Sequence, residues 1–124
     1  MTSTKEAQES YKPKKYPVKI TVVKRFSAED VFGPDHDIRQ VNGELVTKCN
    51  FEEGREFIVE DVESFPEGFC MWAWRDIYKD LSVLFFGGNF NRPYKGKIYV
   101  SCSDGRKPVV FKLERIEDYL GVRT

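Results

Sequence analysis

The sequence has no excess of charge of either sign, and this balance narrows the classes of partner. Twenty basic residues are matched by twenty acidic ones. Nucleic acid and anionic membrane surfaces are bound through basic protein surfaces, because phosphate charge dominates both interactions. We therefore expect neither nucleic acid nor a membrane as the partner, although a local basic patch is compatible with the neutral total.

Long hydrophobic runs are also missing. The longest apolar run, residues 81–86, is interrupted by Ser82 and is far too short to cross a bilayer. Residues 1–17 lack the apolar segment of a secretory signal. Cysteine is scarce, with an odd number of three, and scattered cysteines without a secretion signal favour free thiols or metal ligands over a disulfide scaffold. We expect a cytoplasmic protein.

Signatures of nucleotide binding and of catalysis are sparse as well. The pair Gly87-Gly88 follows a predicted helix instead of preceding one, and no Gly-Lys-Ser/Thr accompanies it, so a phosphate-binding loop is not expected. The carboxylates of Glu52 and Glu53 precede a glycine turn without an identifiable partner. This arrangement favours a solvated turn over an acid–base pair.

What the sequence does contain is enough apolar material for one folded domain. Hydrophobic residues make up 40% of the chain, and ten Phe, six Tyr and two Trp supply large side chains for a core. A stable core is therefore expected without disulfides or metal. Residues 1–17 are rich in lysine and nearly free of apolar side chains, which predicts a disordered basic tail. Residues 18–124 are predicted to form a single domain.

Four segments alternate apolar and polar residues, which is the pattern of half-buried strands. They are residues 18–25, 56–61, 97–102 and 108–115. The last two flank the turn residues Asp104-Gly105 and make the best predicted hairpin of the chain. Between the first two strands, Ser27 and Asp30 resemble a capping box that starts a single helical turn.

One segment, residues 69–84, is long enough for a substantial helix. A turn signal at residues 66–68 precedes it and Gly87-Gly88 follows it, as expected at the two ends of a helix. Apolar residues recur in it at spacings of three and four: Trp74, Ile77, Tyr78, Leu81, Leu84 and Phe85. We predict an α+β fold in which this central helix packs on a small antiparallel sheet, open or barrel-like, with strands in up-and-down order. A mainly β fold with one helix is the alternative.

Several short segments form a distinctive combination. They are AEDVFG at residues 28–33, EEGREF at 52–57, PEGFC followed by WAW within 66–74, CSDG at 102–105 and PVVFKLER at 108–115. Together they resemble a small family of uncharacterised prokaryotic proteins, and the resemblance covers about residues 18–116. It implies domain limits, and it carries no activity or site residues with it.

Cys70 is the thiol for which the sequence predicts the most chemistry. At the start of the predicted helix, its sulfur would lie near exposed amides and the positive end of the helix dipole, which stabilise a thiolate. That position suits the nucleophile of a small enzyme or a metal ligand. The plainer interpretation is a small buried apolar residue beneath Trp72 or Trp74.

The other two thiols, Cys49 and Cys102, extend this hypothesis to a metal or redox site. With Cys70 and His36 they would make a Cys₃His set for zinc, or ligands for iron. Structural zinc sites normally use closely spaced ligand pairs, whereas these residues are far apart in the sequence. The plainer interpretations are a core residue at a strand end for Cys102, an exposed loop residue for Cys49 and a solvated residue for His36.

Aromatic residues form a second group of candidates, which could line a ligand pocket or an interface: Trp72, Trp74, Phe86, Phe90 and Tyr94. Aromatics around a helix are, however, more often core residues. Residues 84–94 are too apolar for a loop that meets only water. They are predicted to cover a pocket or to contact another subunit of a homo-oligomer.

These observations lead to three functional hypotheses. The leading one is a small cytosolic binding or interaction domain that uses the aromatic residues. The alternatives are a cysteine-ligated metal or thiol-redox protein, and a small enzyme with Cys70 as its nucleophile.

Overall fold

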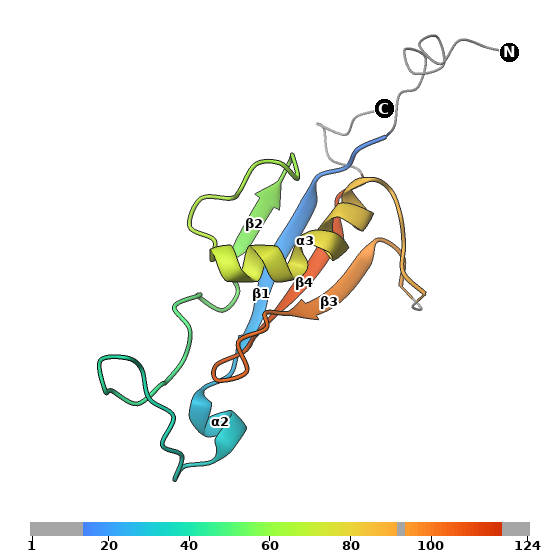
Figure 1. Cartoon of the computed structure of the whole chain (residues 1–124). Helices are drawn as coiled ribbons and strands as arrows, with labels where there is room; N and C mark the ends of the chain where they lie inside the picture. The colour runs from blue at the N-terminus through green and yellow to red at the C-terminus, as the bar shows by residue number, and fades with distance from the viewer. Residues whose placement is uncertain (1–13, 92–93, 118–124) are drawn as a thin grey trace, which may run out of the picture.

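The computed structural model describes residues 14–91 and 94–117, and within them it contains one sheet and two helices (Figure 1). The strands are β1 (Val18–Arg25), β2 (Glu56–Val59), β3 (Lys97–Ser101) and β4 (Val109–Arg115), and the helices are α2 (Ala28–Phe32) and α3 (Met71–Phe85). All strand pairs are antiparallel. The predicted α+β class is confirmed, and the sheet is open instead of closed into a barrel.

The predicted basic tail falls largely outside the described residues, since only residues 14–17 of it are described. Here the backbone N–H of Tyr16 donates to the carbonyl of Phe85 at 2.9 Å, and the N–H of Ile116 donates to the carbonyl of Pro17 at 2.9 Å. Tyr16 and Pro17 therefore already contact the domain before β1 begins.

The strand order differs from the expected one. The four strands lie in the order β2-β1-β4-β3, so the first and last strands pair at the centre of the sheet. Their register runs from Val18–Arg115 to Arg25–Val109, with an irregularity between Val22 and Lys24. The predicted up-and-down order is wrong, because that order would place β1 at an edge. The predicted hairpin of β3 and β4 is confirmed.

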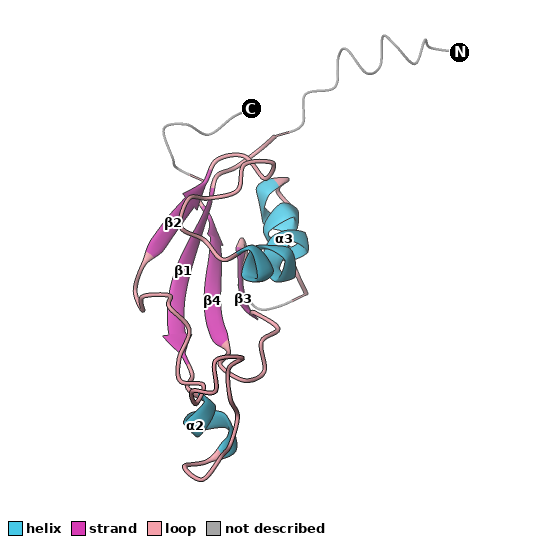
Figure 2. Cartoon of the chain, turned by 60° about the vertical axis from the view of Figure 1, so that its left-hand side comes forward, coloured by secondary structure: helices cyan, strands magenta, loops and turns pink. Residues whose placement is uncertain are grey.

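Helix α3 covers one face of the sheet (Figure 2). The core between them includes fully buried residues of β1, β4 and α3: Val18, Ile20, Val22, Val109, Phe111, Leu113, Ile77, Leu81 and Leu84. The other face carries charged side chains, with Lys19 Nζ 3.5 Å from a carboxylate oxygen of Glu56 and 3.8 Å from one of Glu114. The period-two alternation of the sequence thus separates a helix-covered face from a charged face.

The short helix α2 begins with the predicted capping box. The N–H of Asp30 donates to Ser27 Oγ, and the N–H of Ser27 donates to the Asp30 carboxylate, both at 2.9 Å. The bond from the Ser27 backbone, followed by that of its side chain, lowers the pKa of Asp30. α2 lies beyond the end of the sheet (Figures 1 and 2) and not in the layer of α3.

The C-terminal end of α3 is closed by its own backbone. The N–H of Gly87 donates to the carbonyl of Leu84 at 3.0 Å, and the N–H of Gly88 donates to that of Val83 at 2.8 Å. This pair of bonds is the Schellman motif, which requires a left-handed residue such as Gly87, with a φ of 86°. In the residues that the structure describes, no helix is long and apolar enough to cross a membrane.

The buried side chain of Arg115 reinforces this helix end. Its guanidinium donates to the carbonyl of Leu84 at 3.2 Å, to that of Gly88 at 2.6 Å and to Asn89 Oδ1 at 3.0 Å. The ring of Tyr16 lies 5.4 Å from the guanidinium carbon. Its side chain is only 2% exposed, although arginine is usually a surface residue.

Candidate binding cavity at the start of α3

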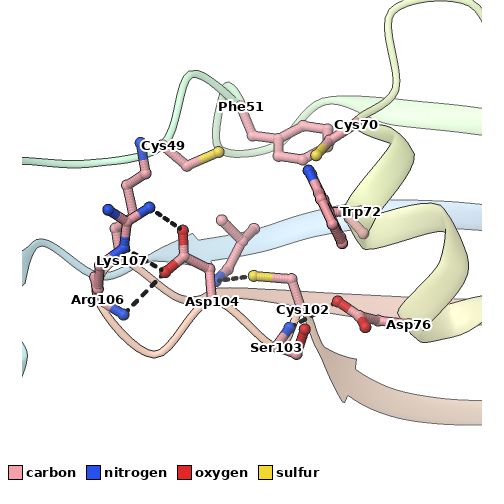
Figure 3. A pocket seen from close by; sticks show the side chains of 12 residues that line it. Cys49, Phe51, Cys70, Trp72, Asp76, Cys102, Ser103, Asp104, Arg106 and Lys107 are labelled. Carbon is pink, nitrogen blue, oxygen red and sulfur yellow. Dashed lines mark hydrogen bonds and ion pairs between the residues drawn. The ribbon is translucent and has the colours of Figure 1, made fainter. Parts of the chain in front are cut away.

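A cavity of about 510 Å³ lies where α3 begins, at the end of the sheet from which β3 leads into β4 (Figure 3). Three segments that are distant in sequence form its walls. The loop before β2 contributes Cys49 and Phe51, and the first turns of α3 contribute Trp72 and Asp76. The connection between β3 and β4 and the residues at its ends complete the wall: Cys102, Ser103, Asp104, Arg106, Lys107 and Val109.

All three cysteines line this cavity, and all three are partly buried free thiols. Cys70 is the N-cap of α3, one residue before the helix, and its side chain makes no capping hydrogen bond. Cys102 Sγ accepts a bond from the N–H of Val109 at 3.3 Å. The carbonyl of Cys49 accepts a bond from Arg25 Nη1 at 3.0 Å, which holds its loop against β1. The structure therefore brings together thiols that no local motif connects.

The predicted Cys₃His ligand set is not assembled. His36 lies outside the cavity, where its Nδ1 accepts a bond from the N–H of Ile38 at 3.0 Å. Within residues 14–91 and 94–117, no group of three or more His, Cys, Asp or Glu side chains is arranged to hold a metal ion. The three thiols share a cavity without forming such a group.

The predicted aromatic residues separate into different environments. Trp72 lines the cavity and is 71% exposed, whereas Trp74 is 8% exposed and belongs to the core. Phe90 packs against that core, Phe86 is exposed after the end of α3, and Tyr94 lies beside Tyr99 at 6.1 Å between ring centroids. Of these five residues, only Trp72 lines the cavity. The predicted role of residues 84–94, to cover a pocket or to contact another subunit, stays a prediction.

Phe51 is the aromatic cavity residue that was not among the predicted site residues, and the polar residues Asp76, Ser103, Asp104, Arg106 and Lys107 were not among them either. The ring of Phe51 meets Phe69 at 5.1 Å and Phe111 at 5.3 Å, both in edge-on geometry, so the core holds it rigidly. The available signal was an isolated aromatic residue in a polar loop, two positions after Cys49. Such a residue needs an apolar contact, and the contact here is the core beneath the cavity.

The polar groups of the cavity are mostly engaged with one another. Asp76 accepts a bond from the N–H of Ser103 at 2.7 Å, and Asp104 accepts from Arg106 Nε at 3.2 Å. Burial raises the pKa of Asp104, but the hydrogen bonds and charge of Arg106 outweigh it and hold the pKa below 3.8. Lys107 makes no ion pair with any residue that the structure describes. Its charge also contributes to the lowered pKa of Asp104.

Comparisons with protein-family models, with curated proteins and with solved structures found no match. The resemblance to a prokaryotic family thus stays a prediction. The fold and the cavity define the chain as a small α+β domain with a cavity lined by thiols and aromatic rings.

Proposed function

We propose that this chain is a small binding domain whose site is the cavity at the start of α3. The observation that carries the proposal is the convergence of Phe51, Trp72 and the three thiols around one hollow of about 510 Å³. Ligand sites are typically concave, mainly apolar and about 300–1,000 Å³ in volume. The volume of the cavity falls within this range, and its lining combines aromatic rings and thiols with the polar side chains of Asp76, Ser103, Asp104, Arg106 and Lys107.

Binding is favoured over catalysis because the carboxylates of the cavity are already hydrogen-bonded within the protein. The carboxylates of Asp76 and Asp104 are already held by an N–H group and by a guanidinium, respectively. A general acid or base needs access to the substrate, and these hydrogen bonds compete with such access. Trp72 exposes most of a large apolar side chain at the cavity, and tryptophan is typical of binding hot spots.

An apolar fluorescent dye that carries an anionic group, 8-anilinonaphthalene-1-sulfonate, tests the proposal. We expect saturable binding with one dye per chain, with the rings in the cavity and the sulfonate near Lys107. Cys49→Phe would fill part of the cavity and lower the affinity about tenfold. Ile58→Phe, on the face of the sheet away from α3, is the matched control and should bind like the wild type.

Cooperative thermal unfolding of each variant must accompany the measurement, because this dye also binds loosely packed proteins. Dye binding that does not saturate, or that Cys49→Phe leaves unchanged, would reject the cavity as the binding site.

Thiol chemistry is a second candidate, favoured by the presence of all three free thiols in one cavity. The hypothesis of Cys70 as nucleophile expects iodoacetamide to modify Cys70 faster than Cys49 and Cys102, as followed by mass spectrometry of the native protein. Equal rates, or a rate at Cys70 no higher than that of a model thiol, would end this hypothesis. A variant with all three cysteines replaced by serine should retain dye binding if the thiols serve only as cavity walls.

A further inference from the structure

The cavity has a neighbouring hollow on each of two sides. A hollow of about 240 Å³ adjoins it and shares Cys49, Phe51 and Cys70 as a common wall, and it extends to Arg55. A second hollow, of about 380 Å³, shares Arg106 and Lys107 with the cavity and extends to Val41. The three hollows are thus neighbours that share wall residues, and we treat them together as one groove. It runs from Arg55 through the central cavity to Val41, and we refer to it below as the groove.

Exposed apolar side chains accompany the groove. Val41 is fully exposed at the tip of the loop between α2 and β2, while Trp72 and its neighbour Met71 are 71% and 57% exposed. A small ligand in the central cavity would leave Val41 in water. A polypeptide segment laid along the groove would contact both Val41 and Trp72, and tryptophan is a typical hot-spot residue of such contacts.

The charges along the groove restrict the chemical class of the partner. Arg55, on one side of Phe51, and Lys107, beyond the cavity, make no ion pair within the described part of the chain. The guanidinium of Arg55 lies 4.5 Å from the Phe57 ring centroid and is exposed. The third cation, Arg106, is neutralised by Asp104. Arg55 and Lys107, neither of them in an ion pair within the described residues, therefore lie on either side of an apolar centre, where Lys107 and Arg106 together act on the single carboxylate of Asp104.

We propose that the groove binds an extended acidic peptide segment of a partner protein. One aromatic or aliphatic side chain of the segment enters the cavity between Phe51 and Trp72, and carboxylates on either side of it lie beside Arg55 and Lys107. The inference rests on the proposed binding function of the cavity and adds the class of partner. Charge complementarity of this kind mainly sets specificity and association rate, and the central apolar anchor supplies affinity.

The test uses the full chain and a fluorescein-labelled peptide with a central Phe between two runs of Glu, followed by fluorescence anisotropy. We expect saturable binding that weakens as salt concentration rises. Replacing the central Phe by Gly, or each Glu by Lys, should abolish it. Arg55→Glu and Lys107→Glu should each weaken binding about tenfold.

Lys95→Glu is the matched control for these two variants. Lys95 is exposed and lies next to the start of β3, whereas the cavity lies at its end. The substitution makes the same change in net charge and should alter the affinity by less than about twofold. A loss equal to that of Lys107→Glu would show that total charge, not the groove, governs binding, and would overturn the inference.

The remaining outcomes separate the inference from the proposed function. Saturable dye binding in the cavity, together with no binding of the acidic peptide, would overturn the peptide groove and leave the binding domain intact. Failure of both probes would remove both proposals. A single-stranded oligonucleotide that displaces the peptide, or a dimer in sedimentation experiments that Trp72→Ala dissociates, would assign the groove to another occupant and also overturn the inference.

Discussion

The two ends of α3 are built in opposite ways. At the C-terminal end, a Schellman motif and the buried guanidinium of Arg115 occupy the carbonyls that a helix leaves unpaired. At the N-terminal end, the N-cap residue Cys70 offers no side-chain hydrogen bond, and the surface opens into the cavity. The hydrogen bonds that close the helix are thus concentrated at one end, whereas exposed aromatic surface and free thiols are concentrated at the other.

This difference indicates which end is shaped for stability. The Arg115 side chain is 2% exposed, and its buried charge is compensated by the hydrogen bonds of Nη1 and Nη2 and by the carboxylate of Glu117, 3.4 Å from Nε. Cys70 lies in an extended conformation with φ −75° and ψ 129°, which suits Ser, Thr, Asp or Asn as an N-cap, yet the residue is a cysteine. Cys70 occupies an N-cap position without forming the capping hydrogen bond, and this favours a role for its side chain at the cavity.

The largest expected effect is at the C-terminal end. Arg115→Ala removes the donors to Leu84, Gly88 and Asn89 and leaves buried acceptors unpaired, so we expect the free energy of unfolding to fall by about 3 kcal/mol. Urea unfolding measures it. Arg39→Ala is the control, because this side chain is 51% exposed and its ion pair with Asp37 should contribute less than about 1 kcal/mol. A loss at Arg115 no larger than the loss at Arg39 would contradict the asymmetry.

The second prediction concerns the packing around the same guanidinium. Gly96 has a φ of 68°, and a Cβ there would lie 3.3 Å from Arg115 Nη2. We expect Gly96→Ala to cost about 1–2 kcal/mol in unfolding free energy, from backbone strain and from displacement of Arg115. Gly54→Ala is the matched control, with a φ of 88° and nothing within 4 Å of the added Cβ. The difference between the two variants isolates the contact, and equal losses would mean that strain alone is measured.

At the N-terminal end the expected change has the opposite sign. Cys70→Ser supplies the missing cap and should stabilise the protein by about 0.5–1 kcal/mol relative to Cys70→Ala, which removes the thiol without supplying a cap. Thermal unfolding of the two variants provides the comparison. Identical stabilities would show that the geometry of Cys70 does not permit capping, and the contrast between the helix ends would then need another explanation.

The smallest effect is expected at the cavity wall. The lowered pKa of Asp104 means that its carboxylate stabilises the fold at pH values above 3.8, and that this contribution is lost as the pH falls through the folded-state pKa. At neutral pH, Asp104→Asn should reduce the unfolding free energy by about 0.5 kcal/mol, since the ion pair with Arg106 is half-exposed. Urea unfolding across acidic pH should show the difference vanishing. A difference that persists in acid, or that high salt leaves unchanged, would contradict this origin.

Features with a local pattern could be predicted from the sequence. β1 was predicted over its observed residues, and the capping box of Ser27 and Asp30 is confirmed by both of its hydrogen bonds. α3 was predicted two residues too early, at residue 69, because Phe69 is apolar and follows a turn signal. Its ring instead belongs to the aromatic cluster with Phe51 and Phe111, so a tertiary contact explains the apolar residue that resembled a helix start.

The candidate site could be predicted only in pieces. Cys49, Cys70 and Cys102 were each singled out, and the cavity does contain all three, but their convergence had no local signal. Trp72 and Trp74 could not be distinguished by residue type, although one lines the cavity and the other is core. Positions two apart on a helix point in different directions, and only the placement of the sheet decides which of them is buried.

The sequence by itself determined the class of the fold, the segments that form strands and helix, and, within the strands, the residues that face the core. These properties follow from backbone sterics and from periodic burial, which act between near neighbours in the chain. The tertiary structure alone decided the pairing of β1 with β4, the burial of Arg115 at the end of α3 and the meeting of three distant segments around the cavity. Each of these features depends on contacts between residues far apart in the chain. The free energy of such a contact depends on how well the two surfaces pack, which no local sequence pattern specifies.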